Sequence, residues 1–198
     1  TKSRAIRVYW MLEELGLKAG PDYTFDPAGP QSEGVRAVSP GGKIPVLVVE
    51  EEGTRHVLPD SVAIVQFLAD RHGDITHPAG TVARGEQDSF TQFAVDEVEG
   101  ALWTASKHSF IYPSEMRVDA IKSVCAAEFD RAMKTLEARL GDRTYVTGER
   151  FTVPDLLLGH CAGWAKLVGF ELPEGTVGAY FSRVRARPAF KAAIAATG

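Results

Sequence analysis

The sequence of 198 residues predicts an α/β segment followed by an all-helical segment. Up to residue 73, the hydrophobic pattern alternates in the order helix, strand, helix, two-stranded hairpin, helix. Residues 74–81 lose this periodicity and contain Pro78 and Gly80, which is typical of a linker, and only helical patterns follow. We therefore expect one domain over residues 1–73 and an all-helical domain over residues 82–198.

Composition narrows the class of protein. Hydrophobic residues make up 44% and charged residues 24% of the chain, as is usual for a globular protein. The formal net charge of −4, with scattered Lys and Arg, argues against a nucleic-acid partner. Apolar runs fall short of the ~20 residues that cross a bilayer, so we expect no membrane span. Cys125 and Cys161 lie far apart in apolar patterns and predict buried, reduced thiols, which excludes thioredoxin-type redox chemistry and favours a cytoplasmic location.

The first domain is predicted to begin with a helix within residues 5–17. Gly16 is expected to end it in a left-handed conformation, with Leu17 packing back on the last turn. The expected buried stripe is Ala5, Val8, Leu12 and Leu15, with Glu13 and Glu14 facing water. The elements predicted next are an extended piece over 23–25, a weak helix over 32–38, strands over 43–49 and 56–58 around a turn at Gly53, and a helix over 62–72 ended by Gly73.

The second domain is predicted to contain only helices. The first covers residues 82–110, and another restarts at Pro113 and ends before Gly141. Thr152 and Asp155 form a capping box that begins the next helix. The last helix covers 176–187 and precedes a short basic tail. The apolar seam expected on the second of these helices is Val118, Ile121, Cys125, Phe129, Leu136 and Leu140.

Three features of the first domain carry residues suited to binding chemistry. Thr1 to Arg4 open the first helix, where hydroxyls and backbone N–H groups stabilise anions; taken alone, Ser3 is explained as an N-cap. Pro45 enters a strand after two glycines, where the peptide bond is either cis or an ordinary trans bond at a strand edge. Asp60 and Ser61 begin a helix, either as a plain cap or as a site for the ammonium and carboxylate of an amino-acid head group.

Together and in this order, these features resemble the glutathione transferase family. The matching motifs are S-R-x-x-R-V-x-W-x-L-E-E-L-G-L, G-K-I-P-V-L and L-x-D-S-x-A-I-x-x-F-L, then the capping box and the segment 183–189. The resemblance covers essentially the whole chain, and residues 107–113 are most similar to bacterial members. It implies a thioredoxin-like glutathione-binding domain followed by an all-α helical bundle, in a cytoplasmic homodimer that conjugates glutathione to a hydrophobic electrophile, as in detoxification, without a metal.

The resemblance also implies roles for individual residues. In the segment Lys43-Ile44-Pro45-Val46, it implies a cis Pro45, a Val46 that pairs with the cysteinyl backbone of glutathione, and a Lys43 near the glycyl carboxylate. Asp60 and Ser61 would hold the γ-glutamyl end. The activating hydroxyl falls on or beside residue 2, so Ser3 is preferred and Thr1 is second. The candidates for the electrophile pocket are Trp103, His108, Phe110 and Tyr112, each of which has an ordinary core or surface alternative.

One departure from the family pattern is the missing first strand, from which we expect further residues before Thr1. Two other functions remain open. One is a non-catalytic interaction module with the transferase fold, and the other is a glutathione-dependent peroxidase or isomerase, because the same thiolate serves all of these reactions.

Overall fold

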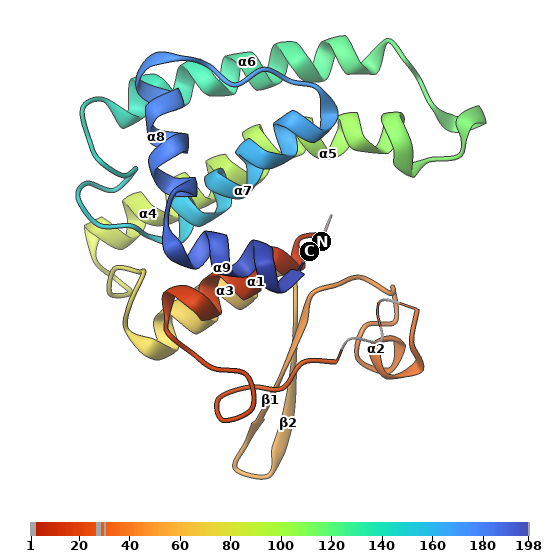
Figure 1. Cartoon of the computed structure of the whole chain (residues 1–198), viewed down its shortest axis with the longest axis vertical. Coiled ribbons are helices and arrows are strands. Elements are labelled where there is room, and N and C mark those ends of the chain that lie inside the picture. Colours follow the sequence, from red (N-terminus) through yellow and green to blue (C-terminus); the bar gives the residue numbers. More distant parts are fainter. Residues whose placement is uncertain (1–2, 27–28, 30, 198) are drawn as a thin grey trace. The chain divides into compact units, whose positions relative to one another are not determined.

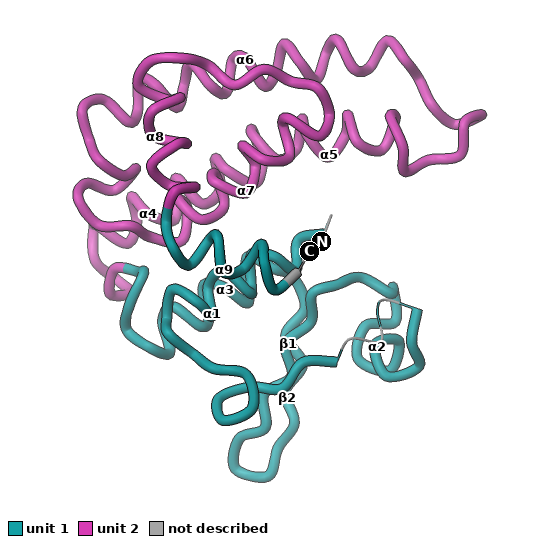
Figure 2. Tube along the Cα trace, in the orientation of Figure 1, with its two compact units in different colours: residues 1–76, 187–198 teal, residues 77–186 magenta. Residues whose placement is uncertain are grey.

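The structure is a computed structural model that describes residues 3–26, 29 and 31–197. Its contacts form two compact units, unit 1 made of residues up to 76 together with those from 187 onward, and unit 2 made of residues 77–186 (Figure 2). Unit 1 thus combines segments from both ends of the sequence. The predicted domain limits, 1–73 and 82–198, stay a prediction, because compact units follow contacts in space rather than stretches of sequence.

Unit 1 is built around a β-hairpin and helices packed beside it (Figure 1). Strands β1 and β2 pair antiparallel, with Val46 opposite Pro59 and Glu51 opposite Thr54. Glu52 and Gly53 connect them with φ of 51° and 74°, the left-handed pair that a two-residue hairpin turn requires. The elements of unit 1 are α1 (Ala5–Glu14), α2 (Glu33–Val38), β1 (Val46–Glu51), β2 (Thr54–Pro59), α3 (Ser61–His72) and α9 (Pro188–Thr197).

The predicted extended piece over residues 23–25 is wrong as a strand. Tyr23 forms only an isolated bridge with Ala19. The chain turns here instead, because the Gly20 N–H donates to the Tyr23 carbonyl at 2.8 Å and the Asp22 N–H donates to the Lys18 carbonyl at 3.0 Å. Among the described residues, the sheet of unit 1 therefore has two strands.

Helix α1 ends as predicted but buries a different face. The Leu17 N–H donates to the Leu12 carbonyl and the Gly16 N–H to the Glu13 carbonyl. These are the two hydrogen bonds of a Schellman motif, and Gly16 has a φ of 69°. Of the predicted stripe, only Leu12 is buried. The side chains that α1 does bury are Ile6, Arg7, Trp10, Met11 and Leu12.

The face of α1 is set by α9, which the sequence analysis treated as a tail. Trp10 is fully buried and packs on Phe190, with ring centroids 4.6 Å apart. The prediction that Glu14 faces water is also wrong, because its side chain is only 5% exposed. Its carboxylate accepts both Nε and Nη2 of Arg187 at 2.6 Å and the Trp10 indole N–H at 2.9 Å. This paired charge explains how an acidic side chain enters the core of unit 1.

Unit 2 is helical throughout its regular structure. As predicted for residues 82–110, one continuous helical run connects α4 (Val82–Phe93), the π-helical turn η1 (Ala94–Glu99), α5 (Gly100–Ser106) and the π-helical turn η2 (Lys107–Ile111). The other elements are the short 3₁₀ turn η3 (Ser114–Met116), α6 (Ile121–Leu140), α7 (Val153–Val168) and α8 (Gly175–Arg185).

The second helix of unit 2 starts later than predicted. After η3, Arg117 is extended, with φ −82° and ψ 138°, and α6 begins only at Ile121. Val118 is therefore 52% exposed and not part of the seam. The rest of that seam is half-buried at Ile121 and buried at Cys125, Phe129, Leu136 and Leu140. Both cysteines are free and buried, as predicted.

The capping box of α7 is confirmed and lies in the core of unit 2. The Thr152 N–H donates to Asp155 Oδ2 at 2.8 Å, and the Val146 N–H and Tyr180 hydroxyl donate to Oδ1 at 3.0 Å and 2.8 Å. Thr152, Asp155 and Tyr180 are fully buried. Burial raises the pKa of Asp155 to about 6, while these hydrogen bonds oppose the rise. Burial and the neighbouring Asp155 raise the pKa of Tyr180 well above its usual value.

Candidate functional site

The hairpin of unit 1 brings two of the predicted motifs to one end of the sheet. Val46 is the first residue of β1 and pairs with Pro59, the last residue of β2. Asp60 and Ser61 follow Pro59 directly at the start of α3. The Ile44–Pro45 bond that precedes Val46 is cis, in agreement with the prediction. Antiparallel pairing thus places the proline motif beside the start of α3 (Figure 1).

Asp60 begins α3 in an unusual backbone conformation. Its φ of 75° and ψ of 127° lie in a region that non-glycine residues rarely adopt. Its Oδ1 accepts the Val62 N–H at 2.8 Å, and the side chain is otherwise exposed. Strained residues of this kind concentrate at binding sites, where surrounding structure holds them in place. The result is a carboxylate presented to solvent at a helix start.

Ser61 is held from behind by a residue that the sequence analysis did not single out. The Arg7 guanidinium of α1 donates a hydrogen bond from Nη1 to Ser61 Oγ at 3.2 Å. Arg7 is fully buried and Ser61 is 2% exposed. The sequence pattern that could have indicated Arg7 is its spacing. Arg7, Trp10 and Glu14 follow one another at intervals of three and four residues and therefore share one helix face.

The loop before Pro45 is fixed by one buried serine. Ser39 Oγ accepts a hydrogen bond from the Lys43 N–H at 3.2 Å and donates one to the Lys43 carbonyl at 2.9 Å. One hydroxyl thus binds both polar backbone groups of Lys43. The Gly42 N–H also donates to the Ser39 carbonyl, at 2.8 Å. The Lys43 side chain is exposed beyond this closed turn. Ser39 therefore sets the direction from which the chain enters Pro45.

The predicted activating hydroxyls lie at the start of α1. Thr1 and Lys2 lie outside the described residues. Ser3 Oγ accepts the Ala5 N–H at 3.3 Å, but the N-cap of α1 is Arg4, so Ser3 lies one residue before the position that the alternative interpretation gave it. Burial, with a smaller effect of Tyr23, raises the pKa of Tyr9 to about 12, so this phenol of α1 stays protonated at neutral pH.

The four predicted pocket residues fall into different local groups of unit 2. The Trp103 and Trp164 rings lie edge to face with their centroids 6.2 Å apart. The Trp164 indole N–H donates a hydrogen bond to Ser106 Oγ at 2.7 Å. The His108 ring instead contacts the Tyr112 ring edge to face, with centroids 5.3 Å apart, and His108 Nδ1 accepts a hydrogen bond from the Val118 N–H at 3.1 Å. Phe110 is 49% exposed.

Trp164 was not among the predicted pocket residues. The sequence pattern that could have indicated Trp164 is a tryptophan within an apolar helical stretch that also contains Gly159 and Gly163. The two glycines leave space for a large neighbouring side chain. The Arg185 side chain lies over Gly163 and donates a hydrogen bond to the Gly159 carbonyl at 2.9 Å.

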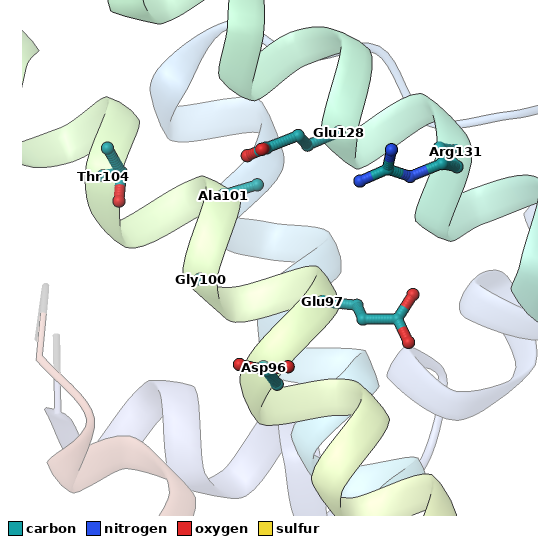
Figure 3. A pocket seen from close by; sticks show the side chains of 7 residues that line it. All are labelled: Asp96, Glu97, Gly100, Ala101, Thr104, Glu128 and Arg131. Carbon is teal, nitrogen blue, oxygen red and sulfur yellow. The ribbon is translucent and has the colours of Figure 1, made fainter.

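A surface depression of about 320 Å³ lies elsewhere in unit 2, between the helical run 94–106 and α6 (Figure 3). Glu97, Glu128 and Arg131 are among the charged side chains around it, and none of the predicted site residues that the structure describes lines it. Its walls are mainly polar, which distinguishes it from the apolar pocket expected for a hydrophobic electrophile.

The described part of the chain lacks two further kinds of feature. No cluster of three or more His, Cys, Asp or Glu side chains suited to a metal ion occurs there. No helix there has both the length and the apolar character that a membrane span needs.

Comparison with known proteins matches both halves of the chain to one family. Residues 3–71 match the glutathione S-transferase N-terminal domain, and residues 92–196 match the glutathione S-transferase C-terminal domain. The glutathione S-transferase GstA of Escherichia coli O157:H7 is 27% identical over 166 residues, which cover 82% of this chain and 77% of that protein.

Solved structures are similar over nearly the whole chain. A glutathione transferase of Methylococcus capsulatus str. Bath has a TM-score of 0.79 and 24% identity, with 98% of this chain and 94% of that chain covered. A glutathione transferase of Phanerochaete chrysosporium, in complex with oxidised glutathione, has a TM-score of 0.78 and 21% identity, with 98% and 90% covered. The predicted fold, a thioredoxin-like domain plus a helical domain, is confirmed, and the chain belongs to the glutathione S-transferase family.

Proposed function

We propose that this protein binds glutathione, stabilises its thiolate and adds it to a hydrophobic electrophile. The observation that carries the proposal is the placement of Val46, after a cis Pro45, beside Asp60 and Ser61 at one end of the hairpin. A tripeptide lying there meets the Val46 backbone along its middle and the start of α3 at its amino-acid end.

The chemistry of the helix start supports this orientation. The Asp60 carboxylate suits the ammonium group of the γ-glutamyl head, because it is exposed and negatively charged. The Ser61 hydroxyl and the first N–H groups of α3 suit the neighbouring carboxylate, since a helix start favours anions. Lys43, exposed beyond the Ser39 turn, is the proposed partner of the glycyl carboxylate.

Conjugation needs the thiol to lose its proton before a sulfur–carbon bond forms. A hydroxyl at the start of α1 would donate a hydrogen bond to the thiolate, and Ser3 is the described candidate. The positive end of the α1 dipole would stabilise the same charge. The electrophile pocket is proposed to use Trp103, His108, Phe110 and Tyr112, with Trp164 as an addition.

The relatives support the proposal at the level of the family. The Phanerochaete chrysosporium structure is in complex with oxidised glutathione. The second candidate function is a non-catalytic interaction module, in which the Ser3 hydroxyl serves only its local hydrogen bond from the Ala5 N–H. The third is a glutathione-dependent peroxidase or isomerase, which uses the same thiolate.

The test is glutathione binding by the Ser61→Ala variant. Loss of a buried, charge-assisted hydrogen bond is expected to weaken binding by about 1–3 kcal/mol, measured by calorimetry. Ser123→Ala, which removes an exposed hydroxyl of α6, is the matched control and leaves the affinity unchanged. Equal affinities of wild type and Ser61→Ala would contradict the proposed site, and turnover of a chromogenic aryl halide separates the enzyme from the interaction module.

We further propose a cytoplasmic homodimer that uses α4 and α6, the helices predicted to begin near Val82 and Pro113. The family supports this proposal, because a single exposed apolar side chain such as Val82, at 92%, does not mark an interface. Light scattering at micromolar concentration tests this proposal, and a monomeric mass contradicts it.

A further inference from the structure

Arg7 is the most unusual buried charge near the start of α3. Arginine is rarely buried completely, because removing its charge from water is costly unless the fold uses it. Here the guanidinium is 0% exposed, and its Nη1 lies 3.2 Å from the Oγ of Ser61, 54 residues further along the chain. Two helices, α1 and α3, thus cooperate to place a positive charge behind one hydroxyl.

The hydrogen bond from Arg7 determines what the Ser61 hydroxyl does. A serine hydroxyl has one proton to donate and two lone pairs to accept with. Because guanidinium is only a donor, Arg7 occupies a lone pair of Oγ and cannot take its proton. The Ser61 O–H is therefore left to donate to another acceptor, and a nearby positive charge strengthens that donation.

The charges on either side of Ser61 are opposite in sign. Arg7 lies behind it in the interior of unit 1, whereas the exposed Asp60 carboxylate precedes it in the sequence at the solvent side. The N-terminal end of the α3 dipole adds to the positive side. A ligand group that carries a carboxylate and an ammonium on the same carbon atom matches this arrangement, with its carboxylate toward Ser61 and its ammonium toward Asp60.

We infer that Arg7 is a positioning residue that makes this helix start selective for the α-carboxylate of the γ-glutamyl head group. Arg7 acts through Ser61: it orients the hydroxyl and supplies a buried positive charge behind the carboxylate. This inference rests on the proposed function, because it assumes that glutathione is the ligand.

The experiment compares three ligands by calorimetry. The first is glutathione. The second is γ-aminobutyryl-cysteinyl-glycine, which lacks only the α-carboxylate, and the third is glutaryl-cysteinyl-glycine, which lacks only the ammonium group. Wild type is expected to bind glutathione about 10- to 100-fold more tightly than the ligand without the carboxylate.

The decisive variant is Arg7→Met, which keeps much of the side-chain volume and removes the charge and the donors. Its preference for glutathione over the ligand without the carboxylate is expected to fall by about tenfold or more. Its preference for glutathione over the ligand without the ammonium, which depends on Asp60, is expected to stay unchanged. A general disturbance of the fold would weaken all three ligands together and leave both preferences as they are.

Two further variants keep the result interpretable. Arg71→Met removes a charge at the other end of α3, where Arg71 pairs with Glu51, and is expected to keep both preferences. Arg7→Lys keeps the charge with a shorter reach, so it is expected to regain part of the carboxylate preference lost in Arg7→Met. If Arg7→Met does not fold, Ser61→Ala replaces it, because it removes the hydroxyl through which Arg7 acts and is expected to lose the same preference.

The outcomes separate this inference from the proposed function. A wild type that binds none of the three ligands overturns both. A wild type that binds glutathione, with an Arg7→Met variant that keeps the full carboxylate preference, overturns the role of Arg7 and leaves glutathione binding intact. A selective loss of the carboxylate preference in Arg7→Met supports both.

Discussion

Two helix starts in this protein use the same kinds of residue for different ends. The start of α7 in unit 2 has Thr152 and Asp155, both fully buried, and the donors to this carboxylate come from the chain itself. The start of α3 in unit 1 has Asp60 and Ser61, of which Asp60 is exposed and has a φ of 75°. One start is closed inside the fold, and the other is open to solvent.

The difference separates a structural acid from a binding acid. At α7, four hydrogen bonds to Asp155 offset part of the cost of its burial, and all of them come from the fold itself, so the group serves stability. At α3, Asp60 keeps only the capping bond to Val62, and its backbone is strained. The open start is expected to contribute less to stability and more to affinity, which four predictions test.

The largest expected effect is at the closed start. Asp155→Ala leaves the Val146 and Thr152 N–H groups and the Tyr180 hydroxyl buried without their acceptor, so the free energy of unfolding is expected to fall by about 3–5 kcal/mol. Urea denaturation measures this fall. Asp130→Ala, which replaces an exposed carboxylate of α6, is the control and is expected to change stability by less than about 0.5 kcal/mol. A loss below about 1 kcal/mol for Asp155→Ala would remove the distinction between the two starts.

The second prediction concerns pH. Because the pKa of Asp155 is about 6 when folded and about 4 when unfolded, the folded state binds the extra proton between these values. The contribution of Asp155 to stability is therefore complete below about pH 4 and is lost as the pH rises to about 6. The stability of wild type relative to Asp155→Asn is expected to fall by up to about 3 kcal/mol over this interval, measured by denaturation at each pH. A relative stability that rises with pH would mean that the hydrogen bonds outweigh burial.

The third prediction tests the other buried acid, Glu14. Glu14→Gln removes the charge that Arg187 pairs with, and the free energy of unfolding is expected to fall by about 2 kcal/mol, since Arg187 still reaches water. Hydrogen exchange is expected to rise most in α9. Glu51→Gln, which breaks the exposed pair with Arg71, is the control, with a loss of at most about 0.5 kcal/mol. Equal losses in the two variants would show that burial of Glu14 adds nothing.

The smallest stability change is expected at the open start. Asp60→Gly removes the strain of a positive φ and gives up only a few tenths of a kcal/mol of capping, so stability is expected to rise by up to about 1 kcal/mol. Glutathione affinity is expected to fall about tenfold or more, because the partner of the ammonium is gone. Thermal unfolding and calorimetry on the same sample measure the two effects, and a variant that binds as well as wild type would contradict the role of Asp60.

The sequence predicted local features well and long-range burial poorly. The capping box at Thr152, the left-handed Gly16 and the hairpin turn at Gly53 depend on neighbouring residues, and all three are present. The buried face of α1 depends on Phe190 of α9 and on Arg187 just before it, and the pattern after Pro188 did not reveal this helix. A stripe assigned from one helix alone could not show which side its partner covers.

The residues of the candidate site show the same difference between local and long-range features. Pro45, Val46, Asp60 and Ser61 were found because their motifs are contiguous. Arg7 was missed because its role depends on a contact across 54 residues, and a charged residue in a helical pattern is first assigned to solvent. The first strand of the family pattern and the role of Thr1 stay predictions.

The pairing of α1 with α9 has a consequence for synthesis on the ribosome. Glu14 and Arg187 are 173 residues apart, so the ribosome adds at least that many residues after α1 before Phe190 can cover Trp10. At about 5–20 residues per second, the nascent chain carries this uncovered indole for roughly ten to thirty seconds. During translation, the helices of unit 2 are complete before α1 can pack on α9.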